Sequence, residues 1–184
     1  MNDFVDRLAA RASEEGLLDV AYATVDTPIG QMVVAATDHG LVRVALPGED
    51  LDRVLEHLAE GVSPRVLAFS RRLDEARREL EQYFEGKRQH FELPLDWRLI
   101  HSGFYRRVLR ATAKVPFGSV ITYSDAARRA GSPRAFRAAG SALGSNPIPI
   151  VVPCHRVVRS GGDIGNYGGG PELKRFLLEH EHAL

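Results

Sequence analysis

The chain contains one cysteine, Cys154, within "NPIPIVVPCHRVV" at residues 146–158. Pro153 ends an apolar, strand-like run, so the residues that follow can begin a new helical turn. A thiol at a helix start, beside His155 and an arginine, lies in surroundings that favour the thiolate. Most single cysteines are nevertheless buried side chains without a chemical role, and adjacent residues need not face one another. The segment by itself leaves both interpretations open.

A histidine next to a thiol becomes a general base when a carboxylate orients its ring. The helical C-terminal segment "PELKRFLLEHEHAL" offers two such carboxylates, Glu179 and Glu181, which point to different faces of the helix. The loop "SGGDIGNYGGG" at residues 160–170 precedes it, and its glycines allow a close approach to a ligand. The pattern is that of an activated nucleophile near a binding loop.

Composition limits the setting of this chemistry. The 184 residues are 44% hydrophobic and 26% charged, as in a globular protein of one ordinary or two small domains. A single cysteine excludes an internal disulfide and a multi-cysteine metal site, and fits a reducing compartment. No apolar stretch approaches the ~18–20 residues of a membrane span, and the N-terminus lacks a signal-peptide core. We expect no membrane association and a cytoplasmic location, or a nuclear one if the source is a eukaryote.

The charge is distributed unevenly along the chain. Residues 1–97 contain 11 Lys and Arg against 19 Asp and Glu, a net charge of −8, and residues 98–184 contain 13 against 5, a net charge of +8. A basic half of this kind favours an anionic partner such as nucleic acid. Charge alone leaves open that the arginines only solvate helix faces.

The first half has the pattern of a small α/β domain. About the first 16 residues have helical spacing, and strand-like runs follow at 20–25, 31–36 and 41–46, which predict an antiparallel meander. We predict helices over 48–61 and 63–86, the second with Ser63 as its N-cap, and an extended segment over 87–97. These elements predict a domain over 1–92 and a linker over 93–101.

The second half, 102–184, is predicted to be mostly helical. Ser102 is expected to cap a first helix, a second helix is expected over 124–130, and a third is expected to begin at Ser132 and Pro133. Two short helices joined by a glycine turn make a helix-turn-helix. The third helix is rich in alanine, glycine and serine, so its surface is nearly smooth and can approach another backbone closely. The predicted fold class is α+β.

Three segments, "VPFGSVITY", "NPIPIVVPCHRVV" and "GNYGGG", resemble the O6-alkylguanine-DNA alkyltransferases, the methylated-DNA–protein-cysteine methyltransferases. The resemblance is strong from Ser102 to Glu181 and general in the first half, where it includes the "TPIG" turn. It implies a ribonuclease H-like N-terminal domain and a winged-helix-like C-terminal domain.

The resemblance also implies a function. Members repair DNA by flipping an O6-alkylguanine, and also O4-alkylthymine, out of the duplex and transferring the alkyl group irreversibly to a cysteine of the protein. Double-stranded DNA is the implied partner. No cofactor is implied, and the zinc site of some relatives needs cysteines that this chain lacks. We expect a monomer without an obligate protein partner.

Carried over by position, four side chains would perform the chemistry. Cys154 would be the nucleophile and alkyl acceptor, His155 its base through a water molecule, and Glu181 the residue that orients His155. Tyr123 would contact the phosphate region of the flipped nucleotide and give a proton to the departing guanine.

Other positions would bind DNA or form the pocket. Arg137 would enter the base stack, and the smooth helix would lie in the minor groove. The implied DNA-binding residues are Tyr123, Arg134, Arg137, Ala138, Gly140 and Ser141. The implied pocket residues are Pro149 (against the alkyl group), Val157, Tyr167, Gly168 and Gly169, with Asn146 and Arg156 as structural support.

The chain departs from the family pattern at three positions in or near this set of residues. Gly168 stands where many relatives have a serine, which removes a possible hydrogen bond to the base. Gly144 stands where some relatives have a second arginine, although Arg134 or Arg128 could contact that phosphate instead. Phe136 replaces the usual alanine before Arg137, and we expect it to pack inward.

Two other functions fit parts of the sequence. Non-catalytic relatives bind alkylated DNA but replace the cysteine, which is present here. A cysteine hydrolase on an unrelated fold would need turnover, whereas a basic helix-turn-helix predicts duplex binding.

Overall fold

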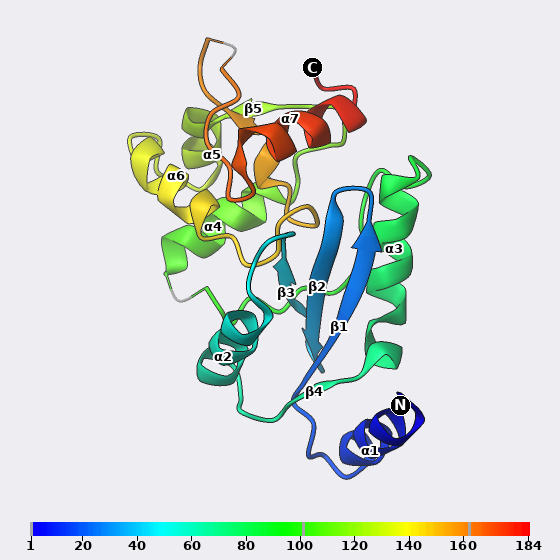
Figure 1. The fold of residues 1–184 in the computed structure, drawn as a ribbon. Coiled ribbons are helices and arrows are strands. Elements are labelled where there is room, and N and C mark those ends of the chain that lie inside the picture. Colours follow the sequence, from blue (N-terminus) through cyan, green and yellow to red (C-terminus); the bar gives the residue numbers. More distant parts are fainter. Residues whose placement is uncertain (1, 101, 162) are drawn as a thin grey trace. The chain divides into compact units, whose positions relative to one another are not determined.

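The computed structural model describes residues 2–100, 102–161 and 163–184 (Figure 1). The chain forms two compact units. The first comprises the chain to Arg88 together with Glu92–Leu99, and the second comprises Gln89–Phe91 and Ile100–Leu184. The first unit contains a four-stranded sheet and helices, and the second is mostly helical, so the predicted α+β class is confirmed.

The sheet of the first unit begins with the predicted meander. Strands β1 (Val20–Thr27), β2 (Gly30–Thr37) and β3 (Gly40–Ala45) pair antiparallel through tight turns. Gly40 has a φ of +124°, and a Cβ there would lie 2.2 Å from the backbone oxygen of Pro94, so only glycine fits. A fourth strand, β4 (Val66–Ala68), pairs parallel to β1 and gives the order β3-β2-β1-β4.

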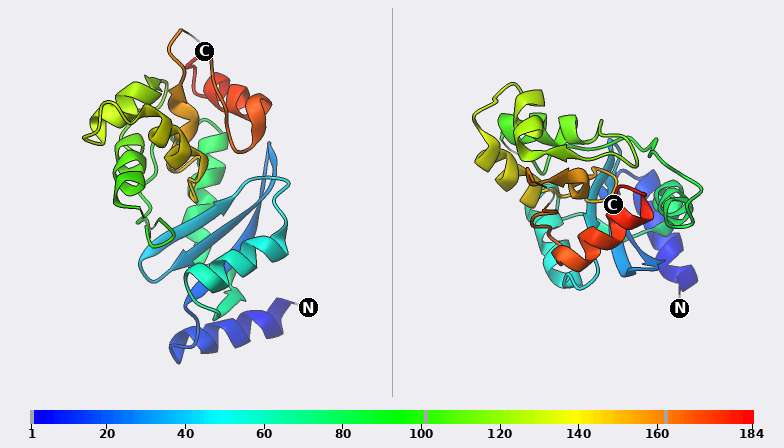
Figure 2. Two further views of the ribbon diagram at one scale, coloured as in Figure 1. Left: turned by 90° about the vertical axis from the view of Figure 1, so that its left-hand side faces the viewer. Right: turned by 90° about the horizontal axis from the view of Figure 1, so that it is seen from above.

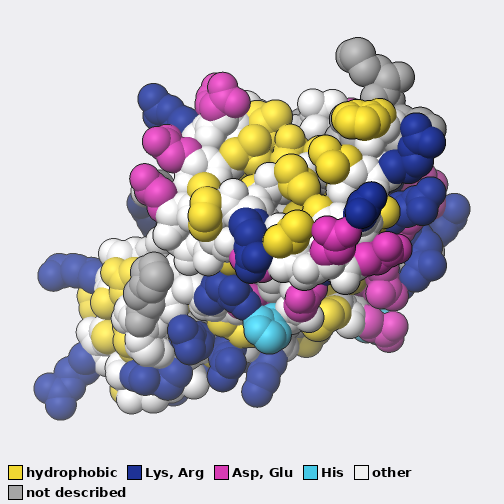
Figure 3. All heavy atoms as spheres, turned by 90° about the horizontal axis from the view of Figure 1, so that it is seen from below, with side chains coloured by type: hydrophobic (Ala, Val, Ile, Leu, Met, Phe, Trp, Pro, Cys, Tyr) yellow, Lys and Arg dark blue, Asp and Glu magenta, His cyan; other side chains and the backbone are white. Residues whose placement is uncertain are grey.

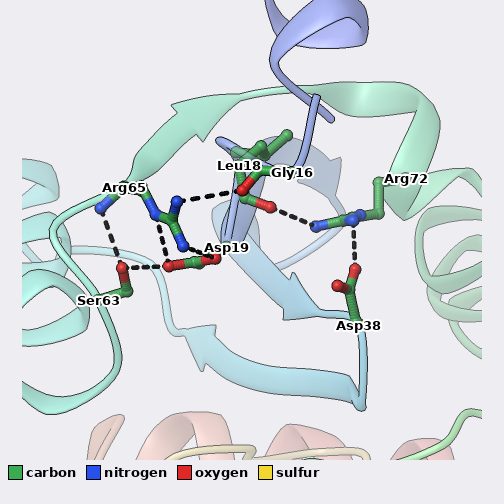
Figure 4. Close-up of polar contacts among 7 residues, drawn as sticks. All are labelled: Gly16, Leu18, Asp19, Asp38, Ser63, Arg65 and Arg72. Carbon is green, nitrogen blue, oxygen red and sulfur yellow. Dashed lines mark hydrogen bonds and ion pairs between the residues drawn. The ribbon is translucent and has the colours of Figure 1, made fainter. Parts of the chain in front are cut away.

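The strand β4 corrects the prediction of one helix over 63–86. Ser63 does not cap a helix, because its hydroxyl donates to Asp19 at 2.5 Å. The guanidinium of Arg65 binds both carboxylate oxygens of Asp19 at 2.8 Å (Figure 4). These contacts hold the segment beside the start of β1, where Val66 pairs with Val20. Helical structure begins only with the 3₁₀ helix η1 (Ser70–Leu73).

Helices cover the sheet on both faces (Figures 1 and 2). Helix α2 (Leu51–Gly61) is capped by Asp50 and packs Val54 and Leu58 against Val20, Val33 and Val42. Helix α3 (Asp74–Phe84) follows η1, and its buried residues include Leu80 and Tyr83. The last six residues of β2 (32–37) are all buried, as expected for a strand covered on both faces.

The first and last segments of this unit differ in how far they match the predictions. Helix α1 (Asn2–Glu14) is present as predicted, but Phe4 and Leu8 on it are exposed. The segment 87–97 forms no regular strand: it makes a single bridge between Leu95 and Leu41, next to which Asp96 accepts a hydrogen bond from Thr37.

The second unit is built on three helices that pack together: α4 (Gly103–Thr112), α5 (Tyr123–Arg129) and α6 (Phe136–Gly144). Ser102 accepts a hydrogen bond from the backbone N–H of Tyr105, so the predicted cap of α4 is confirmed. The short strands β5 (Ile121–Thr122) and β6 (Val157–Val158) pair in parallel, and α7 (Gly170–His180) ends the fold.

Helix α6 begins later than predicted. Residues 132–135 form a turn in which the N–H of Ala135 donates to the carbonyl of Ser132, and the first helical residue is Phe136. Arg134 therefore precedes the helix, and Phe136 and Arg137 stand in its first turn.

None of the helices within the described ranges is long and apolar enough to cross a membrane. On the face drawn in Figure 3, Lys and Arg side chains lie at the lower left and along the right-hand side, and at the right acidic side chains lie among them.

Candidate active site

The backbone before Cys154 consists of tight turns and not of the expected strand. The N–H of Val152 donates to Ile148 at 2.8 Å, and the N–H of Val151 donates to Pro149 at 2.9 Å. The second turn is centred on Ile150, which has a φ of +73°. A β-branched residue rarely adopts this conformation, so backbone strain is stored four residues before the thiol. The 3₁₀ helix η2 (Cys154–Arg156) follows.

Asn146 links the end of α6 to the thiol. Its Nδ2 donates to the carbonyl of Val152 at 2.8 Å and to Sγ of Cys154 at 3.1 Å, and its Oδ1 accepts from the N–H of Ile148 at 3.0 Å. The buried amide therefore satisfies two backbone groups of the turns and fixes the position of the sulfur.

The surroundings of Cys154 keep its thiol protonated. Only 8% of the residue is exposed, and this burial raises its pKa, while the hydrogen bond from Asn146 and the positive charge of Lys174 lower the pKa less. The thiolate-favouring environment expected from a helix start is thus outweighed by desolvation, since η2 has only three residues. The thiol needs a base in order to react.

His155 can serve as that base. Its Nε2 lies 2.8 Å from Oε1 of Glu181, and neither residue is exposed. Burial lowers the pKa of His155 and keeps the ring neutral. Burial alone would raise the pKa of Glu181, but the hydrogen bonds from His155 and Arg156 lower it to about 2, so it is a carboxylate. The carboxylate requires the proton on Nε2, which leaves Nδ1 as the acceptor.

The acceptor atom Nδ1 of His155 is buried and has no hydrogen-bond partner among the described residues. The ring also meets the ring of Tyr167 edge-on at 6.3 Å between centroids. The histidine is thus fixed on one side by Glu181 and able to take a proton on the other.

Arg156 completes the buried charge cluster. Its Nε and Nη2 donate to the two oxygens of Glu181 at 2.7 and 2.9 Å, and Nη1 donates to the carbonyl of Val115. This two-point contact fixes the carboxylate toward His155. Glu179, the other candidate carboxylate, is exposed.

Lys174 is a site residue that the sequence reasoning missed. It is fully buried, and its Nζ donates to the carbonyls of Val157 at 2.6 Å and Asn166 at 3.3 Å. Burial lowers its pKa to about 8. A signal was present in the sequence, since Lys174 shares the helical stripe of the buried Leu177 and Leu178 and of Glu181.

A cavity of about 810 Å³ opens onto the thiol. Its walls come from α5, α6, the thiol and the glycine loop. The described residues that line it include no Asp or Glu. They are Tyr123, Ser124, Phe136, Arg137, Gly140, Ser141, Leu143, Gly144, Cys154, Arg159, Ser160, Asn166, Tyr167 and Gly168. The cavity is therefore large enough for a nucleobase, and its charged side chains are cationic.

Tyr123 stands at the first position of α5. The helix start is fixed by a capping box between Thr122 and Asp125. Burial raises the pKa of Tyr123, so its phenol remains a proton donor at neutral pH. The ammonium group of Lys174 lies 6.0 Å from the centre of its ring.

The structure brings only some of the predicted binding residues to this cavity. Tyr123, Arg137, Gly140, Ser141, Tyr167 and Gly168 line it. Arg134, Ala138, Pro149, Val157 and Gly169 are not among the described lining residues. The expectation that Phe136 packs inward is wrong, because 46% of this residue is exposed. Within the described part of the chain, no group of three or more His, Cys, Asp or Glu could hold a metal ion.

Comparison with known proteins adds relatives for both units. A family model described as "6-O-methylguanine DNA methyltransferase, DNA binding domain" matches residues 103–183, and one described as the "ribonuclease-like domain" of the same family matches residues 20–97. A methylated-DNA–protein-cysteine methyltransferase of Mycolicibacterium paratuberculosis is 38% identical over 166 residues, which cover 89% of this chain and 94% of the relative.

Solved structures agree with these relatives. The O6-methylguanine methyltransferase of Mycobacterium tuberculosis matches with a TM-score of 0.74 and 36% identity, over 89% of this chain and 93% of the other. The crystal structure of Mycobacterium tuberculosis OGT in complex with DNA matches over the same shares with a TM-score of 0.72 and 34% identity.

Proposed function

Because the chain belongs to the 6-O-methylguanine DNA methyltransferase family, we propose that it repairs DNA by transferring an alkyl group from O6 of guanine to Cys154. The observation that carries this proposal is the position of the thiol. Cys154 lies at the wall of a cavity that is large enough for a nucleobase. The next residue in the chain is a neutral histidine that a buried carboxylate orients. A nucleophile, a base and room for a nucleobase therefore meet at one point.

Base flipping follows from where the thiol lies. Only 8% of Cys154 is exposed, and the residue lies at the wall of a cavity, so a base that stays stacked in the duplex does not bring the substituent on its O6 to the sulfur. The sulfur and the alkyl carbon meet if the base leaves the stack and enters the cavity. Arg137, which lines the cavity from the first turn of α6, is the side chain we assign to the space that the base vacates.

The reaction itself is an in-line displacement at the alkyl carbon. The thiol proton passes through a water molecule to Nδ1 of His155, and Glu181 stabilises the imidazolium that forms. Sulfur then forms a bond to the alkyl carbon as the bond from that carbon to O6 breaks. The electron pair of the broken bond stays on the guanine, which accepts a proton from Tyr123. The imidazolium later releases its proton to solvent, and the phenolate takes one up.

The product is a thioether, which water does not cleave under these conditions. Cys154 is the single cysteine of the chain, so no second thiol of the protein can take the alkyl group from it. Each molecule therefore acts once. We assign O6-alkylguanine in double-stranded DNA as the main substrate and O4-alkylthymine as a second one.

Transfer of a radiolabelled methyl group from duplex DNA containing O6-methylguanine tests the proposal. We expect label on the protein at no more than one methyl group per molecule, and none on the Cys154→Ser variant, which should still bind DNA. Label on the serine variant would show that the nucleophile is wrong.

A further inference from the structure

Phe136 is a large apolar side chain that the proposed chemistry leaves unexplained. It is the first residue of α6, 46% of it is exposed, and it lines the cavity next to Arg137. Single exposed apolar residues are common on protein surfaces, so exposure alone means little. The position of Phe136 on α6 indicates whether this exposed side chain has a function.

After its first turn, the face of α6 toward the cavity carries small residues apart from Leu143, whose side chain is buried. Ala139, Ala142 and Leu143 are the buried residues of the helix. The cavity-facing rows continue from Phe136 through Gly140 to Gly144, and from Arg137 to Ser141, with the spacing of successive helical turns. Along these two rows the bulky side chains are Phe136 and Arg137. A duplex laid on this face would meet these two side chains first.

The two side chains also contact each other. The guanidinium carbon of Arg137 lies 5.7 Å from the centre of the Phe136 ring, within the range of a cation–π interaction. The ring thus supports the arginine in a position that projects from the first turn. Proteins that bind the minor groove commonly insert an apolar side chain between base steps.

We propose that Phe136 is a second intercalating residue, which enters the base stack beside Arg137 and holds open the step from which the alkylated base has left. This inference rests on the proposed function, and the occupant of the face is double-stranded DNA. The phenyl ring replaces part of the stacking that the neighbouring base loses, while Arg137 supplies hydrogen bonds and charge. Phe136 is a positioning residue and takes no part in the bond changes.

The test compares substrates that need flipping with one that does not. The single-turnover rate is measured with duplex DNA containing O6-methylguanine and with free O6-benzylguanine. Since base–aromatic stacking is worth roughly 1–3 kcal/mol, Phe136→Ala should slow repair of the duplex by at least about fivefold. Its rate with the free base should fall much less than its rate with the duplex, because the free base needs no wedge in a base stack. A 2-aminopurine next to the lesion should show less unstacking in this variant.

Three further variants distinguish intercalation of Phe136 from other roles of this side chain. Phe136→Leu keeps an apolar wedge and should retain most of the duplex rate, whereas Phe136→Gln should lose it. Phe176→Ala removes a phenyl ring of similar exposure from α7, outside the cavity, and should change neither rate. An unchanged duplex rate in Phe136→Ala, an equal loss with both substrates, or full activity of Phe136→Gln would overturn the inference. Wild-type protein that alkylates Cys154 with neither substrate would instead overturn the proposed function.

Discussion

Oε1 of Glu181 lies 2.8 Å from Nε2 of His155, and both side chains are completely buried. Arg156 binds both oxygens of the same carboxylate from the other side. The negative charge of Glu181 therefore fixes the proton of the imidazole on Nε2 and frees Nδ1 for the thiol. This arrangement is the basis for our proposal that His155 acts as the base for Cys154 and is more than a core residue.

Replacing Glu181 by glutamine should remove one contribution to the pH dependence of the unfolding free energy. Its pKa falls from the ordinary 4.5 to about 2 in the folded protein, so the stabilisation is present above pH 4.5 and is lost as the pH falls toward 2. The difference corresponds to roughly 3 kcal/mol of unfolding free energy. Denaturant titrations between pH 5 and pH 2 should show this extra loss in the wild type and in Glu179→Gln, the exposed control, but not in Glu181→Gln. The same slope in both variants would contradict the assignment.

Removing the charge of Lys174 should make the thiol less acidic. The ammonium group lowers the pKa of Cys154 against the effect of burial, so Lys174→Met should raise this pKa and reduce the thiolate fraction at neutral pH. The rate of iodoacetamide alkylation as a function of pH measures it. Lys114→Met, which removes an exposed lysine of the same unit, should leave the profile unchanged. A profile for Lys174→Met that superposes on the wild type would exclude the electrostatic role.

Truncating Arg137 should impair flipping more than DNA association. Arg137→Ala is expected to slow repair of a duplex at least about tenfold and to leave the rate with free O6-benzylguanine unchanged, because the side chain acts on the stack. Non-specific binding depends on phosphate contacts, so the loss of a side chain that enters the stack should weaken it only modestly. Arg134→Ala, outside α6 and outside the described lining of the cavity, is the control. A normal duplex rate for Arg137→Ala would contradict the finger role.

Adding one methyl group at Gly140 separates protein packing from groove contact. A Cβ there would lie 3.7 Å from the ring of Tyr123, an ordinary contact, and alanine should stabilise the helix by about 0.5–1 kcal/mol. We therefore expect Gly140→Ala to raise the unfolding midpoint and to weaken binding to duplex DNA, since a close approach of the helix is lost. Gly144→Ala, with open space at its Cβ, should bind DNA normally. Equal affinities for both variants would argue against a groove fit at Gly140.

Much of the fold follows from local signals in the sequence. The meander could be predicted because turns that contain glycine separate three runs with strand-like sequences, Val20–Thr27, Gly30–Thr37 and Gly40–Ala45. The cap at Ser102 was equally local. The strand β4 could not be predicted in this way, because Ser63 and Arg65 are drawn to Asp19, 44 and 46 residues away in sequence. Such pairing overrides the local signature of a helix start.

In the site, too, features set by neighbouring residues could be predicted, and features set by the tertiary fold could not. Cys154 and His155 are adjacent in sequence and could be proposed from their types and, with Glu181, from the family resemblance. The acidity of the thiol could not, because it depends on how completely the fold desolvates the sulfur. Lys174 was missed because a lysine on an amphipathic helix is ordinarily exposed. Residues 132–135 form a turn, so α6 starts at Phe136 and not at Pro133. This later start sets the orientation of Phe136, and no local signal in the sequence indicates it.

The most direct test of the central claim is the mass of the intact protein after incubation with excess duplex DNA containing O6-methylguanine. The account predicts one added methyl group per molecule, located at Cys154 by peptide mapping, and no further loss of O6-methylguanine once every molecule is modified. Continued turnover, or an unmodified Cys154 in folded protein, would contradict it.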